Sequence, residues 1–199
     1  MILQSTQHYQ RLYQKLNNYI TIDNSTLQAL EKILKIKTLE REEYISKLYN
    51  DKRVIGFVLD GIVRVYHLNE TGTEYNKNFF VEDDLFMTSL DENVDSTIFV
   101  QTITKSKLIL FDYNAFMLLA QKHETLERVL NKILLEYLSK KQDREIKLLA
   151  LNAKERYAIF VKENPLLSTV LPQFHIASYL GITPTQLSRI RKTYKSQHM

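Results

Sequence analysis

The chain has 199 residues, of which 44% are hydrophobic and 25% charged, so it is long enough to bury a core and too apolar to be disordered. It contains no cysteine, which excludes disulfides, thiolate zinc sites and cysteine nucleophiles. The formal net charge of +4 is unevenly distributed, because residues 140–199 hold 11 basic and 4 acidic side chains whereas residues 1–139 carry a net charge of −3. This asymmetry favours a polyanion-binding C-terminal part attached to a part with a different task.

The first ten residues lack the basic and apolar regions of an export signal. No stretch of the sequence approaches the roughly 20 apolar residues that span a bilayer. We therefore expect a cytoplasmic protein that has no membrane partner.

The N-terminal part combines helices with a β region. Apolar residues recur at intervals of three and four over residues 8–35, which indicates two helices, and Asp23 supplies capping chemistry for the second. Residues 54–111 contain several β-branched runs separated by turns, such as those at Gly61 and Gly72. This pattern predicts an antiparallel β-barrel or jelly roll with flanking helices.

A long helix is predicted over residues 123–151, which contain neither Gly nor Pro. Its apolar positions follow a 4-3-4 spacing, the pattern of a seam that packs against a partner helix. The residues assigned to a homodimer interface are Leu126, Leu130, Ile133, Leu134 and Tyr137. Because residues 139–145 are polar, the seam is too short for an autonomous coiled coil, and packing of this helix on its own barrel remains the alternative.

Residues 152–199 are predicted to be helical. Asn152 is suited to cap a helix that ends at Asn164-Pro165, and residues 168–173 form a connector. Two short helices follow, over residues 175–180 and 184–194, with Gly181 between them.

The last two helices match the spacing of a helix-turn-helix unit. Counted from Gln173, apolar residues are needed at the fourth, eighth, tenth, fifteenth and eighteenth places, and all five places are filled: Ile176, Leu180, Ile182, Leu187 and Ile190. The close crossing of the helices requires a small residue at the fifth place, which is Ala177. The turn favours positive φ at the ninth place, which is Gly181.

The outer face of the second helix is polar and basic. The predicted DNA-binding residues are Thr183, Thr185, Gln186, Ser188, Arg189, Arg191, Lys192 and Lys195. Arg prefers guanine and Gln prefers adenine in a major groove, so Arg189, Gln186 and Thr185 are expected to read bases. The basic residues at positions 191, 192 and 195 are expected to hold the phosphate backbone. An ordinary surface helix would explain neither the Ala and Gly positions nor this cluster of basic residues.

With this unit in place, the chain resembles the Crp/Fnr superfamily of bacterial transcription regulators. The resemblance is carried by residues 176–191, by Glu155-Arg156-Tyr157 upstream and by residues 59–65. It implies an α+β chain with three parts: a cyclic-nucleotide-binding-like effector domain at 1–122, a dimerisation helix at 123–151 and a helix-turn-helix domain at 152–199. It also implies a homodimer that reads double-stranded DNA at a pseudo-palindromic site. RNA polymerase and an unidentified small-molecule effector are further partners that it suggests.

Some residues depart from the family pattern. Members that bind cyclic AMP hold its ribose and phosphate with a Gly-Glu pair and an Arg-Ser pair, whereas residues 82–87 and 95–97 here contain acidic residues and no Arg. The sequence therefore predicts no tight binding of cyclic AMP. Glu42 and Asn50 stand at or near two family glycines, and positions 141 and 142, which contact the purine in the family, are interpreted as solvated. Only residues 194–199 follow the second helix, so the usual two-stranded wing is expected to be missing or reduced.

Two other classes of function compete with this interpretation. A cupin-type metalloenzyme needs several His residues on one barrel face, but the five His residues include no H-x-H pair, so no catalytic residue, metal or cofactor is expected. Haem ligation through His67 or His123 stays open as a sensing mode. The second hypothesis is a ligand-sensing or protein-interaction module that no longer binds specific DNA, which a mobility-shift assay with Arg189→Ala would distinguish.

Overall fold

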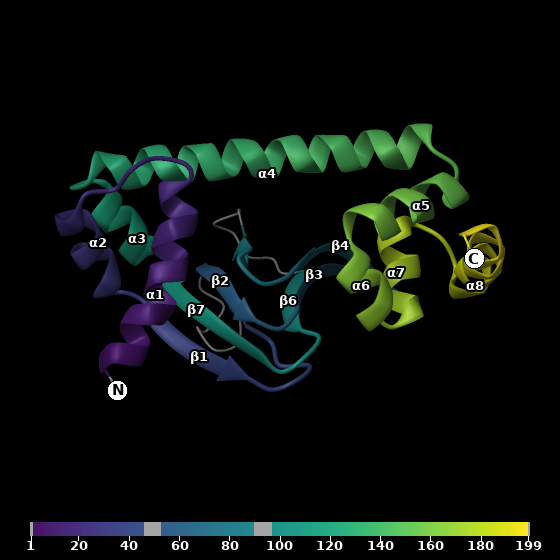
Figure 1. Cartoon of the computed structure of the whole chain (residues 1–199), viewed down its shortest axis with the longest axis horizontal. Coiled ribbons are helices and arrows are strands. Elements are labelled where there is room, and N and C mark those ends of the chain that lie inside the picture. The colour runs from purple at the N-terminus through teal and green to yellow at the C-terminus, as the bar shows by residue number, and fades with distance from the viewer. Residues whose placement is uncertain (1, 46–52, 90–96, 199) are drawn as a thin grey trace.

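The computed structural model describes residues 2–45, 53–89 and 97–198. Three helices flank the strands at the N-terminal end of the molecule: α1 (Ile2–Asn17), α2 (Asn24–Glu31) and α3 (Tyr113–Ala120) (Figure 1). The Asp23 side chain accepts a hydrogen bond from the Thr26 N–H at 2.9 Å, so the predicted cap of α2 is confirmed. None of the described helices combines the length and apolar character needed to cross a bilayer.

The described strands form two antiparallel sheets. One sheet has the order β1-β7-β2-β5, with β1 at Lys35–Leu39, β7 at Ser106–Asp112, β2 at Val54–Asp60 and β5 at Leu85–Met87. The other has the order β4-β3-β6, with β4 at Glu74–Phe80, β3 at Val63–Leu68 and β6 at Ile98–Thr102. The predicted α+β architecture is confirmed, although β1 lies outside the predicted β region.

The four-stranded sheet is covered on both faces. On β2, Val54 and Val58 face the other sheet, whereas Ile55 and Phe57 join a core cluster with the N-terminal helices. Six of the seven residues of β2 are therefore buried, because alternate side chains enter two different cores. Gly56 leaves room for the ring of Phe86, which would lie 2.1 Å from a Cβ at that position.

The predicted turns are confirmed by their backbone geometry. Gly61 has φ +96° and Gly72 has φ +78°, and the Gly72 N–H donates to the Asn69 carbonyl oxygen at 3.0 Å. Glu42, which the resemblance places at a family glycine, also adopts a positive φ, +67°. Asn50 lies outside the described residues.

Helix α4 (Glu124–Ala150) runs along the top of the molecule in Figure 1, from the N-terminal helices to the C-terminal ones. Four helices follow it: α5 (Ala153–Glu163), α6 (Pro165–Val170), α7 (Gln173–Leu180) and α8 (Pro184–His198). The prediction of a connector at 168–173 was wrong in part. Pro165 ends the preceding helix but also occupies the first turn of α6, where its missing N–H costs nothing.

The C-terminal helices share a core with the three-stranded sheet. Ile62, Phe79 and Ile103, from β4 and the loops flanking β3 and β6, belong to the same buried cluster as Tyr157 of α5 and Leu187 of α8. The division at residues 122 and 151 therefore remains a prediction, since this cluster joins side chains from both sides of it.

Candidate nucleic-acid interface

The junction of α7 and α8 is a tight corner centred on Gly181. This residue has φ +66° and ψ +37°, a left-handed conformation that favours glycine. Its N–H donates to the Ser178 carbonyl oxygen at 3.2 Å, and the Ile182 N–H donates to the Ala177 carbonyl oxygen at 3.0 Å. These bonds satisfy carbonyl groups that the end of α7 would otherwise leave unpaired. The chain can therefore turn into α8 within a few residues.

The two helices interlock through the residues that the spacing predicts. Ile176, Ala177 and Leu187 have no exposed surface, and Leu180 and Ile190 are buried in the same cluster. The Thr183 hydroxyl accepts a hydrogen bond from the Gln186 N–H at 3.1 Å, which makes Thr183 the cap of α8. The predicted helix-turn-helix geometry is confirmed.

Most of the predicted DNA-binding side chains lie on the outer face of α8. The exposed ones are Thr183, Thr185, Gln186, Ser188, Arg189 and Lys192. Arg191 is different, since its side chain is half-buried beside Tyr157. Burial raises the pKa of the Tyr157 hydroxyl, and the positive charge of Arg191 acts in the opposite direction. Lys195 belongs to the same helix, and its side chain is not among those described.

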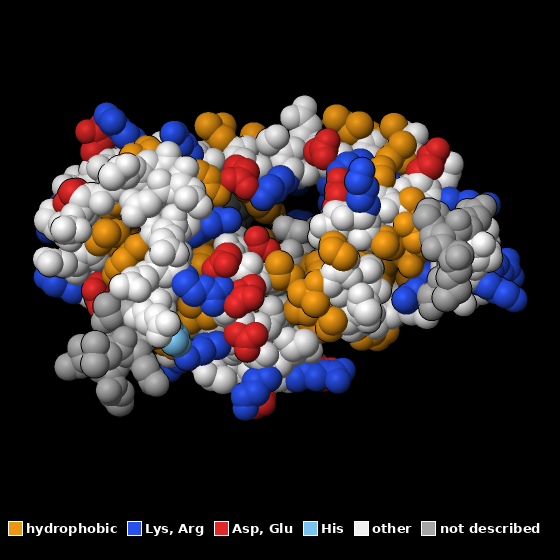
Figure 2. Space-filling model, in the orientation of Figure 1, with side chains coloured by type: hydrophobic (Ala, Val, Ile, Leu, Met, Phe, Trp, Pro, Cys, Tyr) orange, Lys and Arg blue, Asp and Glu red, His pale blue; other side chains and the backbone are white. Residues whose placement is uncertain are grey.

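The outer face of α8 is positively charged. The helix contains no acidic residue. Among the described side chains, no carboxylate lies within ion-pair distance of Arg189 or Lys192. Figure 2 shows Lys and Arg side chains around this end of the molecule. An unneutralised basic face on a protruding helix is suited to contact phosphate groups.

Helix α7 is held against β4 by polar contacts. The Asn76 N–H donates to the Ser178 hydroxyl at 2.9 Å, and that hydroxyl donates to the Glu74 carbonyl oxygen at 2.9 Å. The Asn76 side-chain amide donates to the His175 carbonyl oxygen at 3.1 Å. These bonds fix the first helix of the corner to the edge of the three-stranded sheet.

A buried arginine stands beside these contacts. Arg64, only 5% exposed, bonds to Gln101 through Nε and Nη2 at 2.9 and 2.6 Å and pairs with Glu74 at 2.5 Å. Its Nη1 also lies 3.3 Å from His175 Nδ1. Burial, reinforced by the Arg64 charge, lowers the pKa of His175 to about 4. Sequence reasoning missed this cluster, whose only signal is an arginine inside an apolar strand.

The predicted dimer residues of α4 are turned toward their own chain. Leu126 is fully buried and Leu130 is 7% exposed, both in the cluster formed with the N-terminal helices. Ile133 and Leu134 pack against that cluster, and Tyr137 lines a neighbouring cavity. Leu126 therefore has no free surface to offer a second copy of the chain, and Leu130 has little. The exposed large apolar residues of α4 are instead Leu135, Leu138, Ile146 and Leu149.

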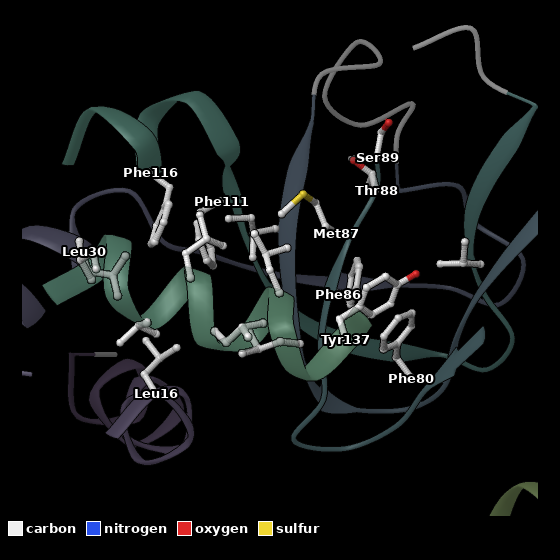
Figure 3. Close-up of a pocket in the computed structure, with 18 of the residues that line it drawn as sticks. Leu16, Leu30, Phe80, Phe86, Met87, Thr88, Ser89, Phe111, Phe116 and Tyr137 are labelled. Atoms are coloured by element: carbon white, nitrogen blue, oxygen red, sulfur yellow. The ribbon is translucent and has the colours of Figure 1, made fainter. Parts of the chain in front are cut away.

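A cavity of about 240 Å³ lies between the strands and α4. Figure 3 shows Leu16, Leu30 and Phe116 at its helical end and Phe80 and Tyr137 at its strand end. Its lining is mostly apolar. Among the described residues that line it, Lys77 of β4 is the cation that could pair with a cyclic phosphate.

The acidic residues that replace the family's ribose-binding pair are neutralised from elsewhere. Arg11 of α1 pairs with Asp83 at 2.7 Å and with Glu82 at 3.0 Å. Asp95 and Ser96, in the second region of the comparison, lie outside the described residues. The absence of tight cyclic AMP binding stays a prediction.

The histidines are dispersed in the part of the chain that the structure describes, where no three His, Asp or Glu residues gather as metal ligands would. His67 lies beside the Tyr75 ring. His123 Nδ1 is 2.9 Å from the Thr26 hydroxyl, a contact that joins α2 to the start of α4.

A part built on two sheets, a long helix and a helix-turn-helix corner follow one another along the chain. The chain has the fold of the Crp/Fnr regulators, and the resemblance drawn from the sequence is confirmed at the level of the fold. No protein-family model matches the sequence, and neither does any curated protein.

Three solved structures illustrate the likeness. FixK2 from Bradyrhizobium japonicum has a TM-score of 0.70 at 19% identity, covering 83% of this chain and 86% of that one. A transcriptional regulator of the Crp/Fnr family from Eubacterium rectale has a TM-score of 0.68 at 11% identity, with coverage of 88% and 85%. The c-di-GMP-responsive regulator CLP from Xanthomonas campestris has a TM-score of 0.65 at 14% identity, with coverage of 88% and 93%.

Proposed function

We propose that this chain is a homodimeric transcription regulator that binds specific double-stranded DNA through α8. The observation that carries the proposal is the exposed basic face of α8, free of carboxylate neighbours among the described residues and set on a tight corner. The fold shared with Crp/Fnr regulators supports it. The suggested contact with RNA polymerase stays a prediction.

Within this proposal the outer side chains of α8 have two roles. Arg189, Gln186 and Thr185 read base edges, because their side chains are exposed whereas Leu187 and Ile190 of the same helix are buried. Lys192 holds the phosphate backbone, as Lys195 does on the same helix. Arg191 takes a lesser part, since its side chain lies toward Tyr157.

The proposed dimer is formed by the exposed side of α4. Leu135 and Leu149 are 66% and 82% exposed and lie 14 residues apart, which is two heptads. Leu138, 58% exposed, lies one turn beyond Leu135. In Figure 2 hydrophobic side chains line the outer edge of this helix. Pairing two such helices would bury these leucines and present two copies of α8 to successive major grooves, about 34 Å apart.

Base reading is tested by mobility shift and fluorescence anisotropy on the promoter of the protein's own gene and on random DNA. Arg189→Ala is expected to lose roughly 1 to 3 kcal/mol on the specific site and little on random DNA. Lys192→Ala is expected to weaken both alike and to lower the salt slope by about 1. Lys32→Ala, at the exposed lysine that caps the C-terminus of α2 at the far end of the molecule, controls for the loss of one charge.

Equal affinity of the wild type for the two DNAs, with both α8 variants equally weakened, would contradict these roles. That outcome would favour the alternative, a ligand-sensing or protein-interaction module that no longer binds specific DNA.

The dimer is tested by sedimentation of a Leu135→Asp, Leu149→Asp double variant, which is expected to be monomeric. Leu166→Asp is the matched control, because Leu166 is a comparably exposed leucine of α6, at 57%. A wild type that sediments as a monomer, or a double variant that stays dimeric, would remove α4 from the proposal.

A further inference from the structure

The cavity between the strands and α4 is apolar along most of its length. Residues from the first three helices, from both sheets and from α4 line it. Its volume of about 240 Å³ suits a small organic molecule rather than a macromolecular segment. Its occupant would therefore be a small molecule with a compact apolar body.

Four polar residues line this cavity: Lys77, Thr88, Ser89 and Tyr137. The Thr88 hydroxyl is already used, as it accepts a hydrogen bond from the Val54 N–H at 2.9 Å, and Ser89 has an interaction of its own. In the described part of the chain, the Lys77 ammonium and the Tyr137 hydroxyl have no hydrogen-bond or ion-pair partner. These two groups are the ones available to a ligand.

Lys77 stands among like charges. Burial lowers the pKa of its ammonium, and the charges of Lys141 and Arg144 lower it further. Tyr137, Lys141 and Arg144 are spaced by four and three residues, so they follow one another along one face of α4. The apolar face that begins at Leu126 thus continues into cations at the end nearest to α7.

Arg144 links this cationic end to the helix-turn-helix corner. Its Nη2 donates to the Tyr179 carbonyl oxygen of α7 at 2.8 Å, and its guanidinium lies 4.5 Å from the centre of the Tyr179 ring. Its Nε is buried without a partner among the described residues. Lys77 itself follows Asn76, the residue that bonds to His175 and Ser178.

We infer that the cavity binds a small amphipathic acid, with its apolar body among the side chains between the strands and α4 and its anionic group at Lys77. An anion there neutralises a partly buried cation that the protein leaves unpaired, and it accepts a charge-assisted hydrogen bond. The Tyr137 hydroxyl is a second donor. A neutral apolar molecule would fill the same space without relieving the repulsion between the three cations.

If the proposed function holds, the acid is also the effector of the regulator. Its anionic group would lie one residue along β4 from the contacts that hold α7 and beside the charge of Arg144. Binding would therefore change the balance of contacts that positions the corner relative to α4.

Titration calorimetry of the full chain tests the site with octanoate and with 1-octanol, which shares its apolar body but has no charge. Octanoate is expected to bind at least about tenfold more tightly, because its head accepts a hydrogen bond from a charged donor. Lys77→Met is expected to abolish this preference, Lys77→Arg to keep it, and Lys37→Met, at an exposed lysine of β1, to leave it unchanged. If octyl phosphate bound more tightly than octanoate, the proposal of an amphipathic acid would stand, and its anionic group would be identified as a phosphate.

The proposal is overturned if the wild type binds neither compound, if octanol binds as tightly as octanoate, or if Lys77→Met retains the preference. The proposal would also be overturned if cyclic AMP displaced bound octanoate at concentrations lower than that of octanoate itself. The DNA assay is then repeated with saturating octanoate. Acid binding in a chain that never binds DNA would refute the proposed function and leave the acid site standing.

Discussion

Lowering the pH is expected to loosen the contact between α7 and the three-stranded sheet, because His175 must remain neutral there. The residue is 7% exposed. Its Nδ1 lies 3.3 Å from Arg64 Nη1 and 3.2 Å from Asn76 Nδ2. Both neighbours are donors, so Nδ1 acts as the acceptor and the proton of the neutral ring is on Nε2. A second proton on Nδ1 would meet two donors and the charge of Arg64.

The size of the effect follows from the pKa of His175, which is about 4 in the folded chain against 6.5 for an unperturbed imidazole. As the pH falls below 6.5, the unfolded state takes up a proton that the folded state refuses until the pH nears 4. Stability is therefore lost as the pH falls through this window. The loss is about 2 kcal/mol at pH 5 relative to pH 8 and approaches about 3 kcal/mol below pH 4.

Urea unfolding at pH 8 and pH 5 measures this loss in the wild type and in His175→Gln, whose amide does not titrate. Carboxylates contribute to the pH dependence of both chains alike, so the difference between the two isolates the histidine. The free energy of unfolding of H175Q is expected to fall by about 2 kcal/mol less than that of the wild type. Equal losses in the two chains would refute the reasoning.

Three further substitutions test the backbone positions on which the fold depends. Gly181→Ala is expected to cost about 1 kcal/mol of stability from its φ of +66° alone, since an added Cβ would meet only Leu148 Cδ2, at 3.7 Å; a Tm equal to that of the wild type would contradict this. Gly56→Ala places a Cβ 2.1 Å from the Phe86 ring and is expected to cost roughly 1 to 3 kcal/mol in urea unfolding, with partial recovery when Phe86→Leu is added; no recovery would show that the ring is not the cause. Asn152→Ala removes the hydrogen bonds from the Lys154 and Glu155 N–H groups at the start of α5 and is expected to lower stability by about 1 kcal/mol, whereas an unchanged stability would show that the cap is dispensable.

Local patterns could be read from the sequence wherever one segment determines its own geometry. The corner at Gly181 was predictable because the spacing of its apolar residues and the need for positive φ are both local. Strand β1 was not, since only Leu39 among its five residues is buried and the strand pairs on one side, with β7. Helix α6 was missed because Pro165 both ends one helix and begins another.

Partners distant in the sequence could not be predicted in this way. The apolar spacing of α4 requires that something cover Leu126 and Leu130, but it does not say whether a second copy of the chain or the chain's own helices do so. The contact between Arg64 and His175 joins residues 111 positions apart, and neither residue type indicates the other. Which leucines of α4 are exposed depends on which of them the rest of the chain covers, and that is a property of the folded structure.

The same long-range contacts bear on how the proposed regulator would be controlled. The helix-turn-helix corner is not attached through α4 alone, because Ile62 and Phe79 share its buried cluster and Asn76 bonds to α7 directly. The position of α8 relative to α4 is therefore set by contacts with the three-stranded sheet as well as by contacts with α4 itself, such as that of Arg144 with Tyr179. In a dimer joined along α4, a shift of β4 would change the separation of the two copies of α8, and hence the match to two successive major grooves. A ligand bound at Lys77 would therefore need to move only β4 to alter DNA binding by the proposed dimer.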